Sequence, residues 1–266
     1  MNYVTLTPLD LALAATMLVI NGGLSVAFQL GLERTLAVAA ARMVAQLLLA
    51  GLVLKFVFQQ TSPVLTAAIA ALMIGAAGYE ALSRQERKIS GWQSLGLSTG
   101  TLFLVGTLSV LFAVGAVIRP SPWYTPQYVL PLLGMVLGNS LTGIALTLDA
   151  VTSNAAAQRG AIEARLSLGA SRFGAMDGVL RRSLKTGLMP ILNSMAATGV
   201  VSLPGMMTGQ ILAGLPPLEA AKYQIMIMFV LAGATAFGVV IAGVGSVLLL
   251  TDDRHRLRLD RLQAIG

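Results

Sequence analysis

Long apolar runs follow one another along almost the whole chain. Seven of them are long enough to cross a bilayer core of about 30 Å as helices, and they cover residues 9–30, 36–58, 64–83, 95–118, 128–150, 188–213 and 225–250. The runs are continuous rather than alternating, and inside lipid only a helix satisfies its own backbone without closing into a barrel. The pattern therefore predicts an all-α polytopic membrane protein with about seven transmembrane helices.

The composition strengthens this prediction. Only 11% of the 266 residues are charged and the mean hydropathy is +0.79, whereas soluble domains carry about 25% charged residues. Seven spans use most of the chain and leave no room for a soluble catalytic domain. We therefore expect one transmembrane domain over residues 1–266, with the first apolar run kept as an uncleaved span because no basic segment precedes it.

The net charge of +7 is explained by membrane topology. Lys and Arg collect in cytoplasmic loops, and fourteen of the 18 basic residues lie at Arg34 and in the stretches 84–88, 159–185 and 254–261. This asymmetry predicts the cytoplasmic (inner) membrane, an outer N-terminus and a cytoplasmic tail over 251–266. The basic residues flank apolar runs instead of forming one basic face, so no nucleic-acid partner is expected.

Few residues are suited to hold a metal permanently. The chain has no cysteine, which excludes disulfides and thiolate sites, and its single histidine, His255, lies in the basic tail. We therefore expect no resident metal site. Glu80 and Asp149 lie near the cytoplasmic ends of their spans, where they either receive a cation in transit or are ordinary solvated carboxylates.

The cytoplasmic region 151–187 has helical periodicity. Its apolar positions recur at spacings of three and four, at Phe173, Met176, Leu180, Leu184 and Leu188. Arg159 and Glu163 are spaced for a helical ion pair, while Gly169 and Ser171 form a break followed by an N-cap. The pattern predicts two helices joined by a turn, the second leading into the span at 188. Binding to anionic lipid and docking of a protein partner both fit this region.

Polar and irregular positions inside the spans are candidates for a gate or pathway, because burying such groups in lipid is costly. The candidates are Asn21, Arg42, Gln46, Asn139, Asn193, Met206, Met207, Gln210 and Glu219. A structural role in hydrogen bonding between helices fits the amides, and methionine is also a common filler of packed helices. Pro204, followed by Gly205, and the pair Pro216–Pro217 predict a broken helix near the outer leaflet.

Two stretches resemble a known family. Glu163, Ala164 and Gly169 resemble the EAA motif of ATP-binding-cassette permeases, in which Glu-Ala-Ala, three residues and Gly form a cytoplasmic coupling helix; Arg165 replaces the second alanine. The run VVSLPGMMTGQILAGLPPLEAAKYQIMIMF at 200–229 resembles the signature of the FetB-type permease family, which includes bacterial iron exporters and plant aluminium-tolerance proteins. The resemblance covers essentially the whole chain.

The resemblance implies a permease subunit that exports iron or another metal ion and is driven by a separate ATPase subunit, as two permeases with two ATPases. The implied coupling residues are Glu163, Ala164, Arg165, Leu168, Gly169, Arg172 and Phe173. ATP and Mg²⁺ are then expected on the partner, since the chain has no GxxxxGK[ST] phosphate loop. We expect neither a cofactor nor enzymatic activity of its own.

Two other functions remain open at this point. An ion-coupled secondary transporter is expected to carry ionisable residues in mid-span, and only Arg42 is clearly of this kind. A membrane scaffold whose cytoplasmic helices recruit a partner is compatible with the same residues.

Overall fold

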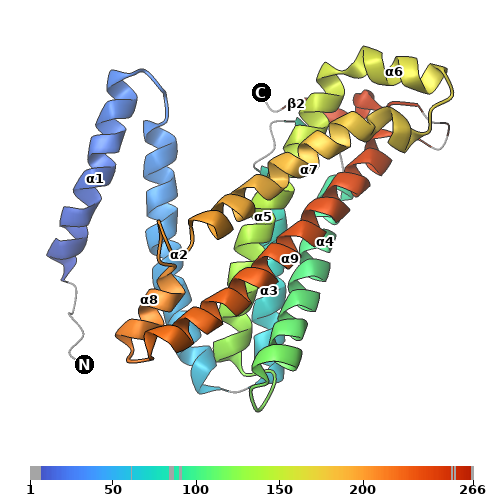
Figure 1. The fold of residues 1–266 in the computed structure, drawn as a ribbon. Coiled ribbons are helices and arrows are strands. Elements are labelled where there is room, and N and C mark those ends of the chain that lie inside the picture. Colours follow the sequence, from blue (N-terminus) through green and yellow to red (C-terminus); the bar gives the residue numbers. More distant parts are fainter. Residues whose placement is uncertain are drawn as a thin grey trace. The chain divides into compact units, whose positions relative to one another are not determined.

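A computed structural model describes residues 7–60, 62–83, 87–89, 92–252, 254 and 256–264 (Figure 1). Contacts between residues divide the chain into two compact units, Met1–Thr61 and Ser62–Gly266. Helices account for most of both units, which confirms the all-α class. In the described part of the chain, six helices are long and apolar enough to cross a membrane.

The first unit is a pair of helices, α1 (Pro8–Ala27) and α2 (Glu33–Gln59). The turn between them is closed by Ser25, whose hydroxyl donates a 3.0 Å hydrogen bond to Glu33 Oε2. Among the described residues of this unit, Ser25 and Val57 alone are buried. The remaining apolar surface of both helices suits contact with lipid or with other protein.

The second unit is a bundle built around α5. Its long helices are α3 (Pro63–Ser83), α4 (Trp92–Phe112, continued by the π-helix η1, Ala113–Ile118), α5 (Pro126–Ala157), α7 (Arg172–Ala197) and α9 (Pro217–Leu250). The central helix α5 contacts the other four. Each of the five helices contributes to one buried core, which includes Ile74, Leu102, Ile144, Ile191 and Ala242.

Glycines let α5, α7 and α9 approach closely. A Cβ atom added to Gly187 of α7 would lie 2.7 Å from the carbonyl oxygen of Gly143 on α5 and would also overlap the Thr147 side chain. A Cβ atom on Gly243 of α9 would lie 2.7 Å from Leu184 Cδ2 on α7. Helix packing in membranes depends on such small residues, because no hydrophobic effect drives helices together within lipid.

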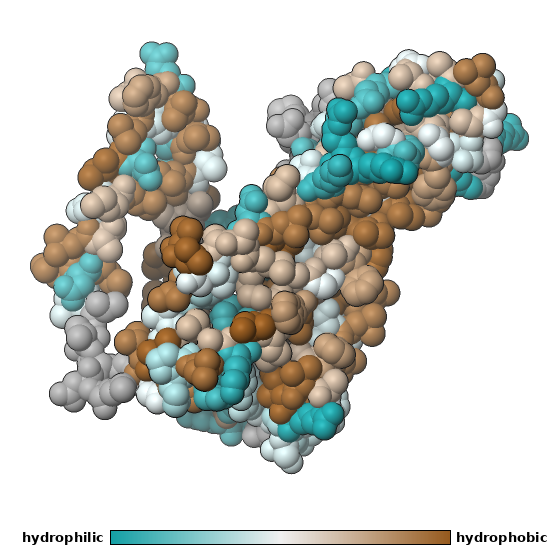
Figure 2. Space-filling model, in the orientation of Figure 1, coloured by the Kyte–Doolittle hydropathy of each residue, from teal (hydrophilic) through white to brown (hydrophobic). Residues whose placement is uncertain are grey.

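One end of the second unit gathers the polar segments. Strand β1 (Arg87–Ile89) pairs antiparallel with β2 (Leu262–Ala264), so the chain after α3 lies beside the C-terminal tail. Helix α6 (Arg159–Ser167) lies at the same end, and α8 (Gly205–Leu212) lies at the opposite end (Figure 1). Hydrophilic residues cover α6 and the start of α7, whereas hydrophobic residues cover the surface farther along α7 and α9 (Figure 2).

The structure differs from the sequence-based prediction in the span at 188–213. This region is not one helix: α7 runs without a break from Arg172 through Pro190 to Ala197, and α8 begins only at Gly205. The positive φ of Gly199, +90°, and Pro204 before α8 end the first helix and start the second. The break expected near Pro204 is therefore confirmed, and α7 and α8 share the length assigned to one span.

Two helix boundaries also differ from the predicted ones. Helix α5 continues to Ala157, past the expected start of the cytoplasmic region at 151, and α9 begins at Pro217 rather than at 225. Hydropathy marks the segment that faces lipid, whereas the backbone hydrogen bonds of a helix continue into its polar ends.

Candidate functional site

The α6–α7 turn has both of its helix ends closed by hydrogen bonds. After α6, the amide of Gly169 donates to the carbonyl of Leu166 and the amide of Ala170 donates to that of Arg165, with Gly169 at φ +89°. These two bonds form a Schellman motif. The Ser171 hydroxyl then accepts a 3.2 Å hydrogen bond from the amide of Gly174 and caps α7. The two helices, the break and the cap predicted from the sequence are confirmed.

The inner face of this region packs into a second core. Ile162 of α6 and Met176 of α7 are buried against the end of α9 and the C-terminal tail. The tail contributes three leucines to this core, Leu257, Leu259 and Leu262. Packing from three segments fixes the orientation of α6 at this end of the bundle.

The outer face carries exposed apolar side chains at the turn. Leu168 is 88% exposed and Phe173 is 40% exposed, although Phe173 was expected to belong to the apolar stripe of α7. In the rest of the stripe, Met176 is buried, and Leu180, Leu184 and Leu188 are partly buried. Ala164 and Gly169 are also exposed. Large apolar side chains beside small residues at a polar end are typical of a protein contact surface.

Two arginines connect residues within this region. Arg159 Nε lies 2.8 Å from Glu163 Oε1, the predicted ion pair. Both side chains are largely exposed, so the pair stabilises α6 by about 0.2–0.5 kcal/mol. Arg165 Nη1 donates a 3.4 Å hydrogen bond to the carbonyl of Ala175 and so joins the end of α6 to α7. Arg165 therefore has a structural contact at the position where the EAA motif has alanine.

The C-terminal tail braces α6, which the sequence interpretation missed. Arg261 Nη1 donates a 2.7 Å hydrogen bond to the carbonyl of Leu249 at the end of α9. Hydrogen bonds from the Arg258 guanidinium lower the pKa of Asp260 to about 2. A cavity of about 390 Å³ lies where the tail meets Arg159 and Glu163. The sequence signal for this packing was the pattern of leucines among charged residues over 257–262. His255, which was expected in the basic tail, lies outside the described residues.

The predicted pathway residues are divided between the two units. Asn21, Arg42 and Gln46 belong to the first unit and are exposed. In the second unit, Asn139 donates from Nδ2 to the carbonyl of Met135 on its own helix, 2.9 Å away, rather than to another helix. Asn193 on α7 is exposed. Within the described residues, the Asn139 side chain thus bonds to its own helix, whereas we expected it to bond to another helix.

The candidates around α8 differ in exposure. Met206 and Met207 are partly buried, and Gln210 has a buried Oε1 atom without a hydrogen-bond partner among the described residues. Glu219, at the start of α9, is exposed and lies 2.7 Å from Lys222 Nζ. An exposed, paired carboxylate is available for a cation only after Lys222 has moved away.

The described residues contain no group of three or more His, Cys, Asp or Glu side chains placed to hold a metal ion. Glu80 of α3 and Asp149 of α5 are partly buried, and each already interacts with other groups of the chain.

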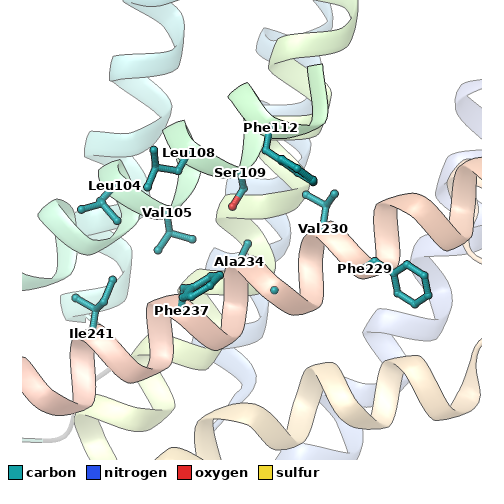
Figure 3. Close-up of a pocket in the computed structure, with 11 residues that line it drawn as sticks. Leu104, Val105, Leu108, Ser109, Phe112, Phe229, Val230, Ala234, Phe237 and Ile241 are labelled. Carbon is teal, nitrogen blue, oxygen red and sulfur yellow. The ribbon is translucent and has the colours of Figure 1, made fainter. Parts of the chain in front are cut away.

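The groove between α4 and α9 is almost entirely apolar (Figure 3). It encloses about 420 Å³ and is lined by side chains such as Leu104, Phe112 and Phe237, with Ser109 as its one polar side chain. Phe112 and Phe237 are well exposed on the side of the bundle. Such a groove suits a lipid acyl chain better than a hydrated ion, whose charge it does not compensate.

Comparisons with known proteins find relatives that are named as membrane proteins. The chain is 30% identical over 267 residues to the probable iron export permease protein FetB of Escherichia coli, an alignment that covers 99% of both chains. It is 37% identical to the UPF0014 membrane protein STAR2 of rice, covering 80% of this chain and 72% of that one. It is also 34% identical to Protein ALUMINUM SENSITIVE 3 of Arabidopsis thaliana, with coverages of 79% and 75%. No solved structure matches.

The family match agrees with the predicted resemblance, because a FetB protein and a plant aluminium-sensitivity protein are both among these relatives. The model of the family described as "Uncharacterised protein family (UPF0014)" matches residues 8–248, which is most of the chain. The chain is a membrane protein that belongs to the UPF0014 family.

Proposed function

We propose that the chain is the permease subunit of an ATP-binding-cassette exporter that moves iron or another metal cation out of the cytoplasm. The observation that carries the proposal is the α6–α7 turn, which presents exposed Leu168 and Phe173 at the polar end of the second unit. The name of the E. coli relative, a probable iron export permease, supports export and the substrate. ATP and Mg²⁺ bind to the partner, and this chain carries no catalytic residue.

The contact with the ATPase is formed by the exposed parts of α6 and of the turn. This contact offers one carboxylate and a small apolar surface, from Glu163, Ala164, Leu168 and Gly169. Arg165 joins α6 to α7 through its hydrogen bond to the carbonyl of Ala175. Arg172 and Phe173 extend this contact onto the first turn of α7. Burial of Leu168 and Phe173 supplies most of the binding energy, as exposed apolar side chains do at the centre of interfaces.

Helix α7 transmits the movement. It is continuous over 26 residues from Arg172 to Ala197, which is about 39 Å at 1.5 Å per residue. Its contact with α5 at Gly187 and Gly143 is so close that no side chain fits between the two helices at that point. A push on Phe173 therefore shifts α7 as a rod along α5 and α9, and the break at 198–204 allows its far end to move relative to α8.

The functional assembly is two permeases with two ATPases in the cytoplasmic membrane. We expect the N-terminus outside and the tail in the cytoplasm, since α6, the first half of α7 and the tail carry ten of the 18 Lys and Arg residues. Tags at residue 86 and at the C-terminus are expected to report cytoplasm, and a tag at Ser121 the outside. A reversed pattern contradicts this orientation.

The decisive experiment is transport by the complete complex. Permease and its ATPase subunit are co-expressed, and ATP-dependent accumulation of Fe²⁺ is measured in inside-out vesicles. Accumulation is expected only with both subunits and with hydrolysable ATP. Accumulation that follows an ion gradient without ATP identifies a secondary transporter instead, and ATPase binding without any accumulation identifies a scaffold.

A further inference from the structure

Helix α7 turns one face away from the bundle. Arg181, Arg182 and Lys185 are exposed on this face, and so are Met189 and Leu192 farther along the helix. At 3.6 residues per turn, these five positions fall within an arc of about 100° around the helix axis. The buried residues of α7 lie mainly on the other side of the helix. The face is therefore continuous over about three turns and is not used in packing within the bundle.

The chemistry of this face changes once along its length. Its first part carries the three cations, and its second part carries Met189 and Leu192, so hydrophilic surface gives way to hydrophobic surface along α7 (Figure 2). Helix α7 packs along α5 and α9, which are long and apolar enough to cross a membrane. The change from basic to apolar residues is therefore expected at the boundary between lipid headgroups and acyl chains.

Two of the three cations lack a counter-charge. Arg181 Nε lies 2.8 Å from Asp177 Oδ1, which balances its charge. Among the described residues, Arg182 and Lys185 form no ion pair. They lie three positions apart on adjacent turns, where Cβ atoms are about 5–6 Å apart. One phosphate group can contact both side chains at this spacing, since both are good phosphate ligands.

Two other occupants fit this face less well. A soluble protein reaches the basic part but does not cover Met189 and Leu192 at the depth of the acyl chains. A second copy of the chain that packs through the same face about a two-fold axis brings like charges together, which is repulsive. An anionic phospholipid fits both parts, because its phosphate and its acyl chains follow one another in the same order as the cations and the apolar side chains.

We propose that this face of α7 binds an anionic glycerophospholipid of the cytoplasmic leaflet, with its phosphate between Arg182 and Lys185 and an acyl chain along Met189 and Leu192. The choice of leaflet rests on the orientation given with the proposed function, and the cytoplasmic leaflet is the one whose anionic lipids attract basic segments near the membrane. The α6–α7 turn then contacts the protein partner, while the next turns of the same helix contact lipid.

The test measures lipid binding by the purified full-length chain. Native mass spectrometry at increasing phosphatidylglycerol concentration gives a dissociation constant, with phosphatidylcholine as the neutral lipid for comparison. Each of Arg182→Gln and Lys185→Gln is expected to raise the dissociation constant for phosphatidylglycerol about fivefold, and the double variant about 25-fold. Phosphatidylcholine is expected to bind at least about fivefold more weakly than phosphatidylglycerol and to be little affected by these substitutions. Added salt is expected to weaken phosphatidylglycerol binding in the wild type more than in the double variant.

The matched control is the double variant Asp177→Asn with Arg181→Gln. It removes an exposed ion pair from the same helix without changing the net charge, so phosphatidylglycerol binding is expected to stay within about twofold of the wild type. Arg182→Lys keeps the charge and is expected to bind nearly as the wild type does. Glutamine is a good helix former, and thermal unfolding checks that α7 is intact in every variant.

Each result supports or overturns the inference. Equal binding of the two lipids by the wild type overturns it, as does a dissociation constant for phosphatidylglycerol within about twofold of the wild type in the Arg182 and Lys185 double variant. Equal losses in this variant and in the control indicate a structural effect and also overturn it. Loss of ATPase co-purification with unchanged lipid binding assigns the face to the protein partner instead. None of these measurements uses transport, so absence of ATP-driven Fe²⁺ export contradicts the proposed function alone.

Discussion

The two ends of α7 are built in opposite ways. At its N-terminal end, the Schellman motif, the Ser171 cap and the hydrogen bond of Arg165 satisfy the local backbone groups and fix the helix to α6. At its C-terminal end, the carbonyls of Met195 and Ala196 accept no backbone amide within the described residues. The carbonyl of Ala197 still accepts from the amides of Val201 and Ser202, so this end is closed only in part, whereas the first end is fixed and suited to receive force.

The largest change in stability is expected from a substitution in the middle of α7, between its two ends. In Gly187→Ala the new methyl group collides with the backbone of α5, so we expect a loss of about 1–3 kcal/mol in stability and separation of α7 from α5. Thermal unfolding in detergent measures this loss. The matched control is Gly178→Ala on the same helix, where nothing lies within 4 Å. This control is expected to gain up to about 1 kcal/mol from helix propensity. Equal stability of the two variants contradicts the rod described for α7.

The closed end is tested next through Glu163→Ala. Because its ion pair with Arg159 is exposed, stability is expected to change by only about 0.5 kcal/mol or less, while ATP-driven transport falls at least about tenfold through loss of the partner contact. Co-purification of the ATPase and vesicle transport measure this. Asp177→Ala removes an exposed pair of the same 2.8 Å length on α7 and is expected to transport normally. Full transport in Glu163→Ala removes this residue from the proposed contact.

A smaller effect is expected from the cap itself. Ser171→Ala leaves the amide of Gly174 without its acceptor and is expected to destabilise the start of α7 by about 1 kcal/mol. Faster hydrogen exchange at Gly174 and the next amides is the measurement. In the control Ser167→Ala, the lost hydroxyl bonds only to the carbonyl of Glu163 in its own helix, so exchange in α7 is expected to stay unchanged. Equal exchange in both variants shows that the cap does not hold this end.

The smallest effect concerns pH and the tail. The pKa of Asp260 is about 2 in the folded chain and about 3.9 when unfolded. A lowered pKa stabilises the fold fully above the unfolded value, and this contribution is lost as the pH falls through the folded value. Protection of the tail from protease is therefore expected to be constant between pH 5 and 8 and to decrease below about pH 4. In Asp260→Asn the part of this decrease due to Asp260 is expected to be absent, and a transition near pH 6 contradicts the assignment.

The helix content and the α6–α7 turn were predictable from the sequence because they depend on local rules. Apolar length predicts a helix in lipid, and Gly169 followed by Ser171 predicts a helix end and a new cap. Pro204 likewise marked the break before α8. The predicted helix boundaries were wrong where a helix continues past its apolar segment, as α5 does beyond residue 151. Hydropathy does not detect the polar continuation of a helix.

The roles of single polar residues were less predictable. Asn139 looked like an interhelical contact, yet its amide bonds to its own helix. The burial of Gln224 in α9 was not predicted, because nothing in the local sequence distinguishes a buried glutamine from one that faces lipid. Arg165 departed from the family motif, and only the position of Ala175 in space gives it a partner.

The sequence by itself determined that this chain is a membrane protein, and that its helices break at Gly169 and before Pro204. Each of these properties follows from residues close together in the chain. The tertiary structure alone decided that the tail braces α6, that α7 lies against α5 at two glycines, and that the end of α7 and Gln224 line one cleft. These contacts join residues far apart in sequence, and they form only when helix packing brings the segments together.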